Sequence, residues 1–151
     1  MALTASYVEI AEALVAKLEA NSTALGLKGV FYGDQNKLPA TPIVCVEPDI
    51  KDNVAMTPTR NLTVEVLIFL IVYHSAVDSP QANRQASDTL AEAIEDLIHE
   101  DPFLLRNDAT PRVVQCYIKS IASGYVKKGT GIVRASRLTF HALTKHQLPN
   151  G

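Results

Sequence analysis

The residues of this chain that could carry out chemistry are few, and their spacing is unfavourable for a catalytic or metal site. His99, Glu100 and Asp101 are consecutive, and neighbours in sequence do not share one face of a helix. No cysteine or carboxylate stands at the short, paired spacing that would join His141 or His146 in a zinc site. There is no Gly-x-Ser-x-Gly elbow and no cysteine in a polar context near a histidine. The sequence therefore predicts no metal, no cofactor and no enzymatic activity.

The two cysteines and the glycine-rich segment near the C-terminus have simpler interpretations. Cys45 and Cys116 each lie in an apolar, strand-like run, so we expect both to be reduced and buried as small hydrophobic residues. Gly129-Thr130-Gly131 joins two predicted strands rather than opening a helix. This context favours a hairpin tip over a phosphate-binding loop.

Charge is distributed unevenly along the chain, which bears on association rather than on fold. Residues 1–100 contain six Lys or Arg and fourteen Asp or Glu (6 − 14 = −8), whereas residues 101–151 contain eight and two (8 − 2 = +6). The basic residues concentrate on the predicted C-terminal hairpin: Lys119, Lys127, Lys128, Arg134, Arg137 and Lys145. The second predicted helix is acidic instead, at Asp88, Glu92, Glu95 and Asp96.

The basic hairpin admits three interpretations. It could neutralise nucleic-acid phosphates, although the chain as a whole is slightly acidic and lacks interleaved aromatic residues for base stacking. It could be a solvated hairpin face. It could also be the partner of the acidic helix on an adjacent identical subunit, since like charges at helical spacing repel unless a basic surface offsets them. Such a contact between different patches is heterologous and can close into a ring.

The order of helical and strand-like segments is typical of an α+β domain. Ser6 and Glu9 have the spacing of a capping box at the start of a first helix. Asp78-Ser79-Pro80 is typical of the start of a second helix, whose expected buried stripe is Ala86, Leu90, Ala93, Ile94 and Leu97. We expect an antiparallel or mixed β-sheet with long strands and a C-terminal β-hairpin, and two main α-helices packed on one face.

The strands are expected at residues 29–33, 43–47, 61–74, 112–123 and 132–144. Pro48 is expected to end the second strand, so residues 49–60 are predicted to be a long polar loop. Residues 125–131 are predicted to be a hairpin turn. In the strand at 61–74, both faces become apolar from Leu67 onward, which predicts a helix of the same chain on one face and a second element or a neighbouring subunit on the other.

The length and composition are those of one globular domain. A chain of 151 residues with 47% hydrophobic content is long enough to bury a core. We expect a single domain over residues 1–146 and a tail at 147–151. The start of the chain does not resemble a signal peptide, and the longest apolar run is far too short to span a bilayer. We therefore expect a soluble protein, made in a cytoplasm, with no membrane partner.

The loop ending in Thr57-Pro58-Thr59-Arg60, the following strand, the Asp78-Ser79-Pro80 helix and the Lys128-Gly129-Thr130-Gly131 hairpin together resemble the tail terminator (tail completion) proteins of tailed bacteriophages. The resemblance extends from the first helix to about Lys145 and lies in the order, length and placement of the elements.

The resemblance implies a structural virion protein, assembled in the host cytoplasm, that forms a homohexameric ring on the head-proximal end of the tail. Such a ring caps the tail tube protein, stops polymerisation, joins the neck or connector protein and, in contractile phages, adjoins the tail sheath. Genomic DNA passes through its lumen without sequence-specific binding.

The charge pattern and the resemblance to tail terminators together indicate which residues to expect at subunit, tube or neck interfaces. The loops at 51–60 and 124–131 are expected to order on docking, and the charged helix and hairpin are expected to meet between subunits. The candidates are Lys51, Asp52, Arg60, Asp88, Glu92, Asp96, Lys127, Lys128, Arg134 and Arg137. The alternatives are another phage neck or head-completion ring protein, and a small ligand-binding α+β domain whose site would lie in a concave pocket.

Overall fold

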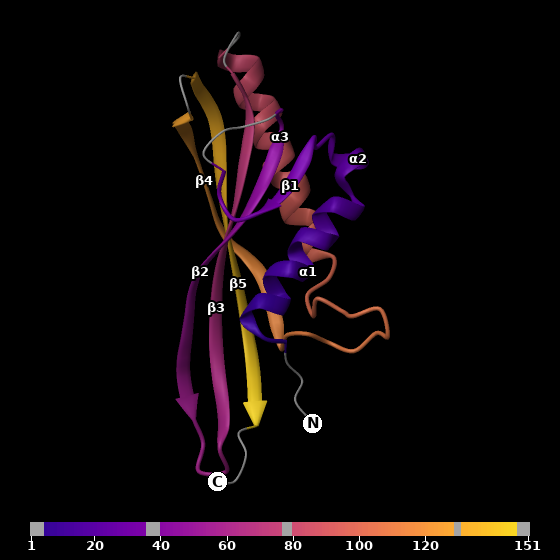
Figure 1. The fold of residues 1–151 in the computed structure, drawn as a ribbon, viewed down its shortest axis with the longest axis vertical. Helices are drawn as coiled ribbons and strands as arrows, with labels where there is room; N and C mark the ends of the chain where they lie inside the picture. The colour runs from indigo at the N-terminus through magenta and orange to yellow at the C-terminus, as the bar shows by residue number, and fades with distance from the viewer. Residues whose placement is uncertain (1–4, 36–39, 77–79, 129–130, 148–151) are drawn as a thin grey trace.

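The chain folds as one long, twisted sheet with its helices on a single side (Figure 1). The computed structural model describes residues 5–35, 40–76, 80–128 and 131–147. The helices are α1 (Tyr7–Ala20), α2 (Ser22–Leu25) and α3 (Pro80–His99), and the strands are β1 (Gly29–Tyr32), β2 (Ile43–Met56), β3 (Asn61–Ala76), β4 (Gln115–Lys128) and β5 (Gly131–Gln147). The strand order is β1-β2-β3-β5-β4, with β1 parallel to β2 and the other pairs antiparallel. The predicted α+β class, with long strands and a C-terminal hairpin, is confirmed.

One face of the sheet, which we call the helix face, carries the main core. Alternate residues of the central strands point to it and are almost fully buried, among them Val66, Ile68 and Leu70 of β3 and Leu138 and Phe140 of β5. Helices α1 and α3 cover this face with Ile10, Leu14, Leu18, Ile94 and Ile98. Each such side chain contributes about 1.5–3 kcal/mol when it leaves water. The predicted alternation in β3 and β5 therefore identifies the core correctly.

The opposite face of the sheet, which we call the open face, has no helix over it among the described residues (Figure 1). At one end it carries a small second cluster, formed by Ile43, Cys45, Tyr73, Val133 and Ala135. Farther along β3, Leu67, Phe69 and Ile71 are only half-buried. Of the two covers predicted for this face, a second element of the same chain is not found among the described residues. The other, a neighbouring subunit, stays a prediction.

The segment at 49–60, predicted to be a loop, is mostly strand. β2 continues through Pro48 to Met56 and pairs with β3 along that whole length, with register shifts at Pro48/Ile50 and Asn53/Ala55. Pro48 is tolerated because β1 pairs only with residues 43–46, so this part of β2 is a sheet edge and lies beside a bulge. Residues 57–60 form the turn, in which Arg60 has a left-handed backbone (φ 64°). We call residues 50–65 the arm, because here β2 and β3 extend beyond α1 (Figure 1).

The strands of the C-terminal hairpin are also longer than predicted. β4 runs to Lys128, so residues 125–128 are strand rather than turn, and β5 runs through His146 to Gln147, where a tail was expected. Both extensions arise because the backbone groups pair with a neighbouring strand, β5 for β4 and β3 for β5. The predicted cap at Asp78-Ser79, the tip residues Gly129-Thr130 and residues 148–151 lie outside the described residues.

The helix starts agree largely with the sequence. Ser6 Oγ accepts a hydrogen bond from the Glu9 backbone N–H at 3.1 Å, as expected for an N-cap. In α3 the buried stripe is Ser87, Leu90, Ala91, Ile94 and Ile98, so the prediction is shifted by part of a turn. Ala86 is exposed, because Ser87 faces the sheet and its hydroxyl lies 3.3 Å from that of Ser136.

Candidate interaction surfaces

The charged residues predicted to meet between subunits are partly used within the chain. Arg134, expected on a basic surface, is buried, and its Nη2 lies 3.8 Å from Asp88 Oδ1 of α3. Its guanidinium also lies 5.0 Å above the Tyr125 ring, and its Nε has no hydrogen-bond partner among the described residues. The structure thus pairs Asp88 with Arg134 inside one subunit.

Lys128 and Arg137 are likewise engaged on the open face. Lys128 Nζ lies 3.0 Å from Asp34 Oδ2, donates to the Gln35 carbonyl at 3.0 Å and lies 5.0 Å from the centre of the Tyr73 ring. The Arg137 guanidinium lies 4.6 Å from the centre of the Phe69 ring. Arg137 is still exposed, so its charge remains accessible at this face.

Asp34 organises this end of the open face. Its Oδ1 accepts a hydrogen bond from the Tyr73 hydroxyl at 2.6 Å. Burial by itself would raise the pKa of the Asp34 carboxyl, but the hydrogen bonds from Tyr73 and Lys128 outweigh it and hold the pKa below its ordinary value. Burial, followed by the hydrogen bond to Asp34, raises the pKa of Tyr73. A hollow of about 420 Å³ lies beside this cluster, with Ile71, Ala122, Gly124, Val126, Ala135 and Arg137 among its lining residues.

Three of the predicted charges on the hairpin and on α3 are exposed and take part in no ion pair or cation–π contact among the described residues. Lys127 is exposed near the end of β4, and Glu92 and Asp96 are exposed on α3. They stand in two different places: Lys127 lies on the β4–β5 hairpin, whereas Asp96 lines a groove between α2 and α3. Unlike Asp88, Arg134 and Lys128, these three residues make no ion pair with another described residue, so their charges are free for contact with another molecule.

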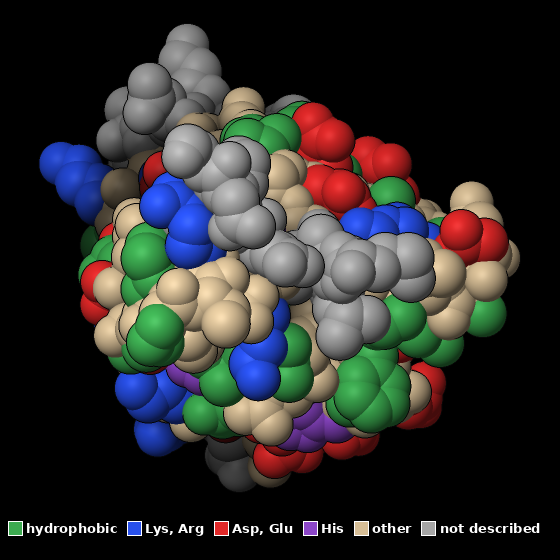
Figure 2. Space-filling view, turned by 90° about the horizontal axis from the view of Figure 1, so that it is seen from below, with side chains coloured by type: hydrophobic (Ala, Val, Ile, Leu, Met, Phe, Trp, Pro, Cys, Tyr) green, Lys and Arg blue, Asp and Glu red, His purple; other side chains and the backbone are tan. Residues whose placement is uncertain are grey.

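The other three predicted residues lie on the arm. Lys51, Asp52 and Arg60 are all exposed, as is every residue from 51 to 60. The arm also exposes apolar side chains: Val54 and Met56 are 54% and 56% exposed. In the view from the arm end (Figure 2), the coloured side chains show basic, acidic and apolar groups interspersed, without the continuous basic surface that phosphate binding favours.

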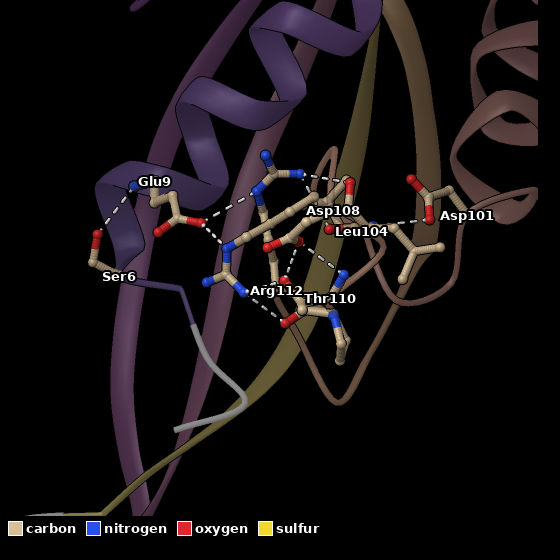
Figure 3. A network of polar contacts seen from close by, with 10 residues as sticks. Ser6, Glu9, Asp101, Leu104, Asp108, Thr110 and Arg112 are labelled. Carbon is tan, nitrogen blue, oxygen red and sulfur yellow. Dashed lines mark hydrogen bonds and ion pairs between the residues drawn. The ribbon is translucent and has the colours of Figure 1, made fainter. Parts of the chain in front are cut away.

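A polar network that the sequence did not predict joins α1 to the segment between α3 and β4 (Figure 3). Glu9 Oε2 accepts hydrogen bonds from Arg106 Nε at 3.1 Å and from Arg112 Nε at 3.2 Å. Arg112 Nη1 also donates to the carbonyls of Leu104 and Leu105. The capping-box spacing suggested instead that Glu9 reaches back to the start of α1, and no local signal indicates partners about a hundred residues away.

The cysteines and His99, which could carry out chemistry, are all placed by the structure. Within residues 5–35, 40–76, 80–128 and 131–147, no three His, Cys, Asp or Glu side chains are grouped so as to hold a metal ion. Cys45 and Cys116 are free and buried, as predicted, and burial raises the thiol pKa to about 11 and about 12 respectively. His99 Nε2 accepts a hydrogen bond from the Ile118 backbone N–H at 3.0 Å. Among the helices described, none is long and apolar enough to cross a membrane.

Comparison with known proteins identifies a structural neighbour but no sequence family. No protein-family model matches the chain, and no curated protein sequence does. A chain in the solved structure "Virion of native gene transfer agent (GTA) particle" superposes with a TM-score of 0.59 and 18% sequence identity, over 90% of this chain and 94% of that one. At this identity the likeness establishes a shared fold along nearly the whole length of both chains.

Proposed function

We propose that this protein is a structural component of a phage-like virion, and more specifically the tail terminator that forms a ring on the head-proximal end of the tail tube. The observation that carries the proposal is the likeness, over 90% of the chain, to a chain of a gene transfer agent virion particle. The resemblance in element order to tail terminators adds the finer assignment. The role is structural rather than enzymatic.

The shape of the molecule supports a role in assembly. A sheet with one uncovered face, an exposed arm and two strand edges offers several surfaces that a lone subunit leaves in water. The outer edge of β2 beyond residue 46 and the outer edge of β4 have no strand beside them in the described sheet. In a homohexameric ring, neighbouring copies would cover part of these surfaces.

The arm is the part that we assign to the tail tube or the neck. It carries exposed Val54 and Met56 together with Lys51, Asp52 and Arg60, and it projects away from the helices. Arg60 takes a left-handed backbone conformation, which costs roughly 1–2 kcal/mol for a residue with a side chain. Such strained positions cluster at functional sites, which supports a role for the Arg60 side chain in docking.

The partners that follow from this role are other virion proteins. The tube protein would meet one rim of the ring, the neck or connector protein the other, and a sheath protein the outside in a contractile tail. Genomic DNA would pass through the lumen without a sequence-specific contact.

The experiment that tests this function compares tail lengths. Particles assembled with and without this protein, from an otherwise identical set of virion proteins, are measured by electron microscopy. A terminator stops tube polymerisation, so its omission should give tubes of uncontrolled length and few tails joined to heads. Tails of normal, uniform length that still join heads in its absence would exclude the proposed role.

A further inference from the structure

The end of the β4–β5 hairpin carries an exposed apolar and basic surface on the same side of the sheet as the helices. In the antiparallel register, Tyr125 lies opposite Arg134 and Lys127 lies opposite Ile132. Arg134 points to the helix face, since it forms an ion pair with Asp88 of α3. Residues paired across two strands, and residues two apart on one strand, point to the same face of a sheet. Tyr125, Ile132 and Lys127 therefore point to the helix face as well. We call these three residues the knob.

The knob is poorly covered by its own chain. Tyr125 is 50% exposed, Ile132 is 60% exposed, and Lys127 is exposed as well. Arg134 beneath them is buried, but its Nε lacks a hydrogen-bond partner in the described part of the chain. A large isoleucine and a tyrosine left in water beside a lysine form a small apolar patch with a positive charge, which is typical of a contact surface.

A groove of complementary character lies between α2 and α3. Residues at helical spacing on one flank of α3, Ala86, Thr89, Ala93, Leu97 and Glu100, face Ala24 and Leu25 of α2. They line two adjoining hollows of about 390 and 360 Å³ that share Ala24, Leu25 and Ala93. Alanines and leucines make up much of the lining, so an apolar side chain can pack against it.

The rim of this groove is acidic. Asp96 and Glu100 line it, Glu92 lies one turn before Asp96 on the exposed surface of α3, and no lysine or arginine of the described chain lines either hollow. The like charges at this spacing repel one another in an isolated helix. A lysine brought to the rim would relieve that repulsion while an apolar neighbour fills the floor.

The knob and the groove cannot meet within one subunit. β4 is one edge strand of the sheet, and α2 lies on the far side of α3 from it, toward the β1 edge (Figure 1). We infer that the groove between α2 and α3 is the docking site for a second copy of this chain, whose knob places Ile132 against Leu25 and Leu97 and Lys127 beside Asp96 and Glu92. Because the two patches differ, the contact is heterologous and repeats from copy to copy.

This inference rests on the self-assembly part of the proposed function and names the surfaces that perform it. It also revises the predicted interface: Asp88 and Arg134 pair within the subunit, and Lys128 and Arg137 belong to the open face, which leaves Lys127, Glu92 and Asp96 for the contact between subunits.

The test is disulfide trapping with the full chain. A double variant, Lys127→Cys with Asp96→Cys, is oxidised at low salt, and the products are separated without reductant. The native Cys45 and Cys116 are buried and do not compete. A heterologous contact gives a ladder of linked copies beyond the dimer, and an equimolar mixture of the two single variants gives only a dimer of unlike chains.

Charge reversal gives an independent measurement by sedimentation. Asp96→Lys or Lys127→Glu alone should weaken self-association about fivefold, and the two together should restore it, since the pair is attractive again. Glu12→Lys on α1 and Lys119→Glu on β4 make matched charge changes on exposed residues outside both patches, and should leave association unchanged.

Failure of the docking site can be distinguished from failure of the proposed function. An absence of trapped copies, a Lys127→Cys chain that links only to itself, or a double reversal no better than the single ones overturns the inference. If trapping fails while omission of the protein still gives tubes of uncontrolled length, the proposed function stands and only the docking site is wrong. If trapping succeeds while tails made without the protein have a normal, uniform length and still join heads, the docking site is supported and the terminator role is excluded.

Discussion

Arg134 is a cation buried on the C-terminal hairpin, beside Tyr125 and Ile132, which are 50% and 60% exposed. A buried cation is costly unless it is paired, and Asp88 at 3.8 Å is its ion-pair partner among the described residues. The pair also joins α3 to β5. Its contribution to stability therefore depends on both residues together.

We predict that Asp88→Asn lowers the free energy of unfolding by about 1–3 kcal/mol, because it leaves the Arg134 charge without an anion. Urea denaturation measures the change. Glu12→Gln, which neutralises an exposed carboxylate outside the proposed contact, should change stability by less than about 0.5 kcal/mol. Adding Arg134→Met to Asp88→Asn should recover part of the loss; equal effects of Asp88→Asn and Glu12→Gln would show that the ion pair does not contribute.

The two thiols give the folded state a pH dependence in the alkaline range. Burial raises the thiol pKa from the ordinary 9.0 to about 11 for Cys45 and about 12 for Cys116. The unfolded chain therefore loses these protons first, so the stability that the neutral thiols contribute is present below pH 9 and is lost as pH rises through the folded pKa values.

We therefore predict that the free energy of unfolding falls between pH 9 and about pH 12, and that Cys116→Ala makes the fall shallower. Urea denaturation across that range measures both slopes. A thiol reagent at pH 8 should modify neither cysteine until the chain unfolds, because both are buried and protonated. Rapid modification of the folded protein, or identical slopes for the two proteins, would contradict the prediction.

At the scale of elements, Glu9 fixes the position of α1 relative to the irregular segment before β4. One carboxylate oxygen accepts from two arginines that also hold backbone carbonyls of that segment (Figure 3). The contact joins Glu9 to arginines 97 and 103 residues later in the chain, in a segment that belongs to no helix or strand. Removing the charge should loosen the segment without unfolding the sheet.

We predict that Glu9→Gln destabilises the protein by about 1 kcal/mol, since two charge-assisted hydrogen bonds on a partly exposed site become weaker. Hydrogen exchange should show faster exchange of the backbone N–H groups between α3 and β4. Glu12→Gln, exposed on the same helix, is the control and should have no such effect. Unchanged exchange in Glu9→Gln would indicate that packing alone holds the segment.

The outer part of the arm, residues 51–60, is exposed throughout and is expected to act on partners rather than to support the core. Val54→Asp with Met56→Asp should leave the free energy of unfolding within about 0.5 kcal/mol, because both side chains are already more than half exposed. The same double variant should fail to cap tail tubes, measured as tube length by electron microscopy. Asn53→Asp, an exposed polar position that pairs with Val64 beside the register shift, is the control. Capping that survives the double substitution would exclude a role for the arm's apolar side chains.

At the scale of the whole molecule, self-association should depend on salt. A contact made by exposed charges is screened over about 8–10 Å at physiological ionic strength, so it weakens as salt is added. We predict a hexamer or smaller open assemblies at low salt and high concentration, and smaller species at high salt, measured by light scattering across a concentration series. A tight dimer insensitive to salt would favour an isologous contact and the ligand-binding alternative.

The sequence by itself determined the core and the class of fold. The alternation in β3 and β5 identified the buried face, because successive strand residues point to opposite sides of a sheet. The cap at Ser6 was predicted from local spacing for a similar reason, since its partner lies only three residues away. Both patterns are local, so they survive in the sequence without knowledge of distant contacts.

Only the tertiary structure decided which charged residues are available. Local sequence cannot indicate that Arg134 is buried against Asp88, or that Lys128 is held by Asp34, because these partners lie 46 and 94 residues away and meet only after the sheet is formed. It also could not indicate that β2 continues past Pro48, because a proline ends a central strand but not an edge strand with a bulge. The pairing of residues 50–56 with β3 extends β2 beyond Pro48, and this extension forms the arm.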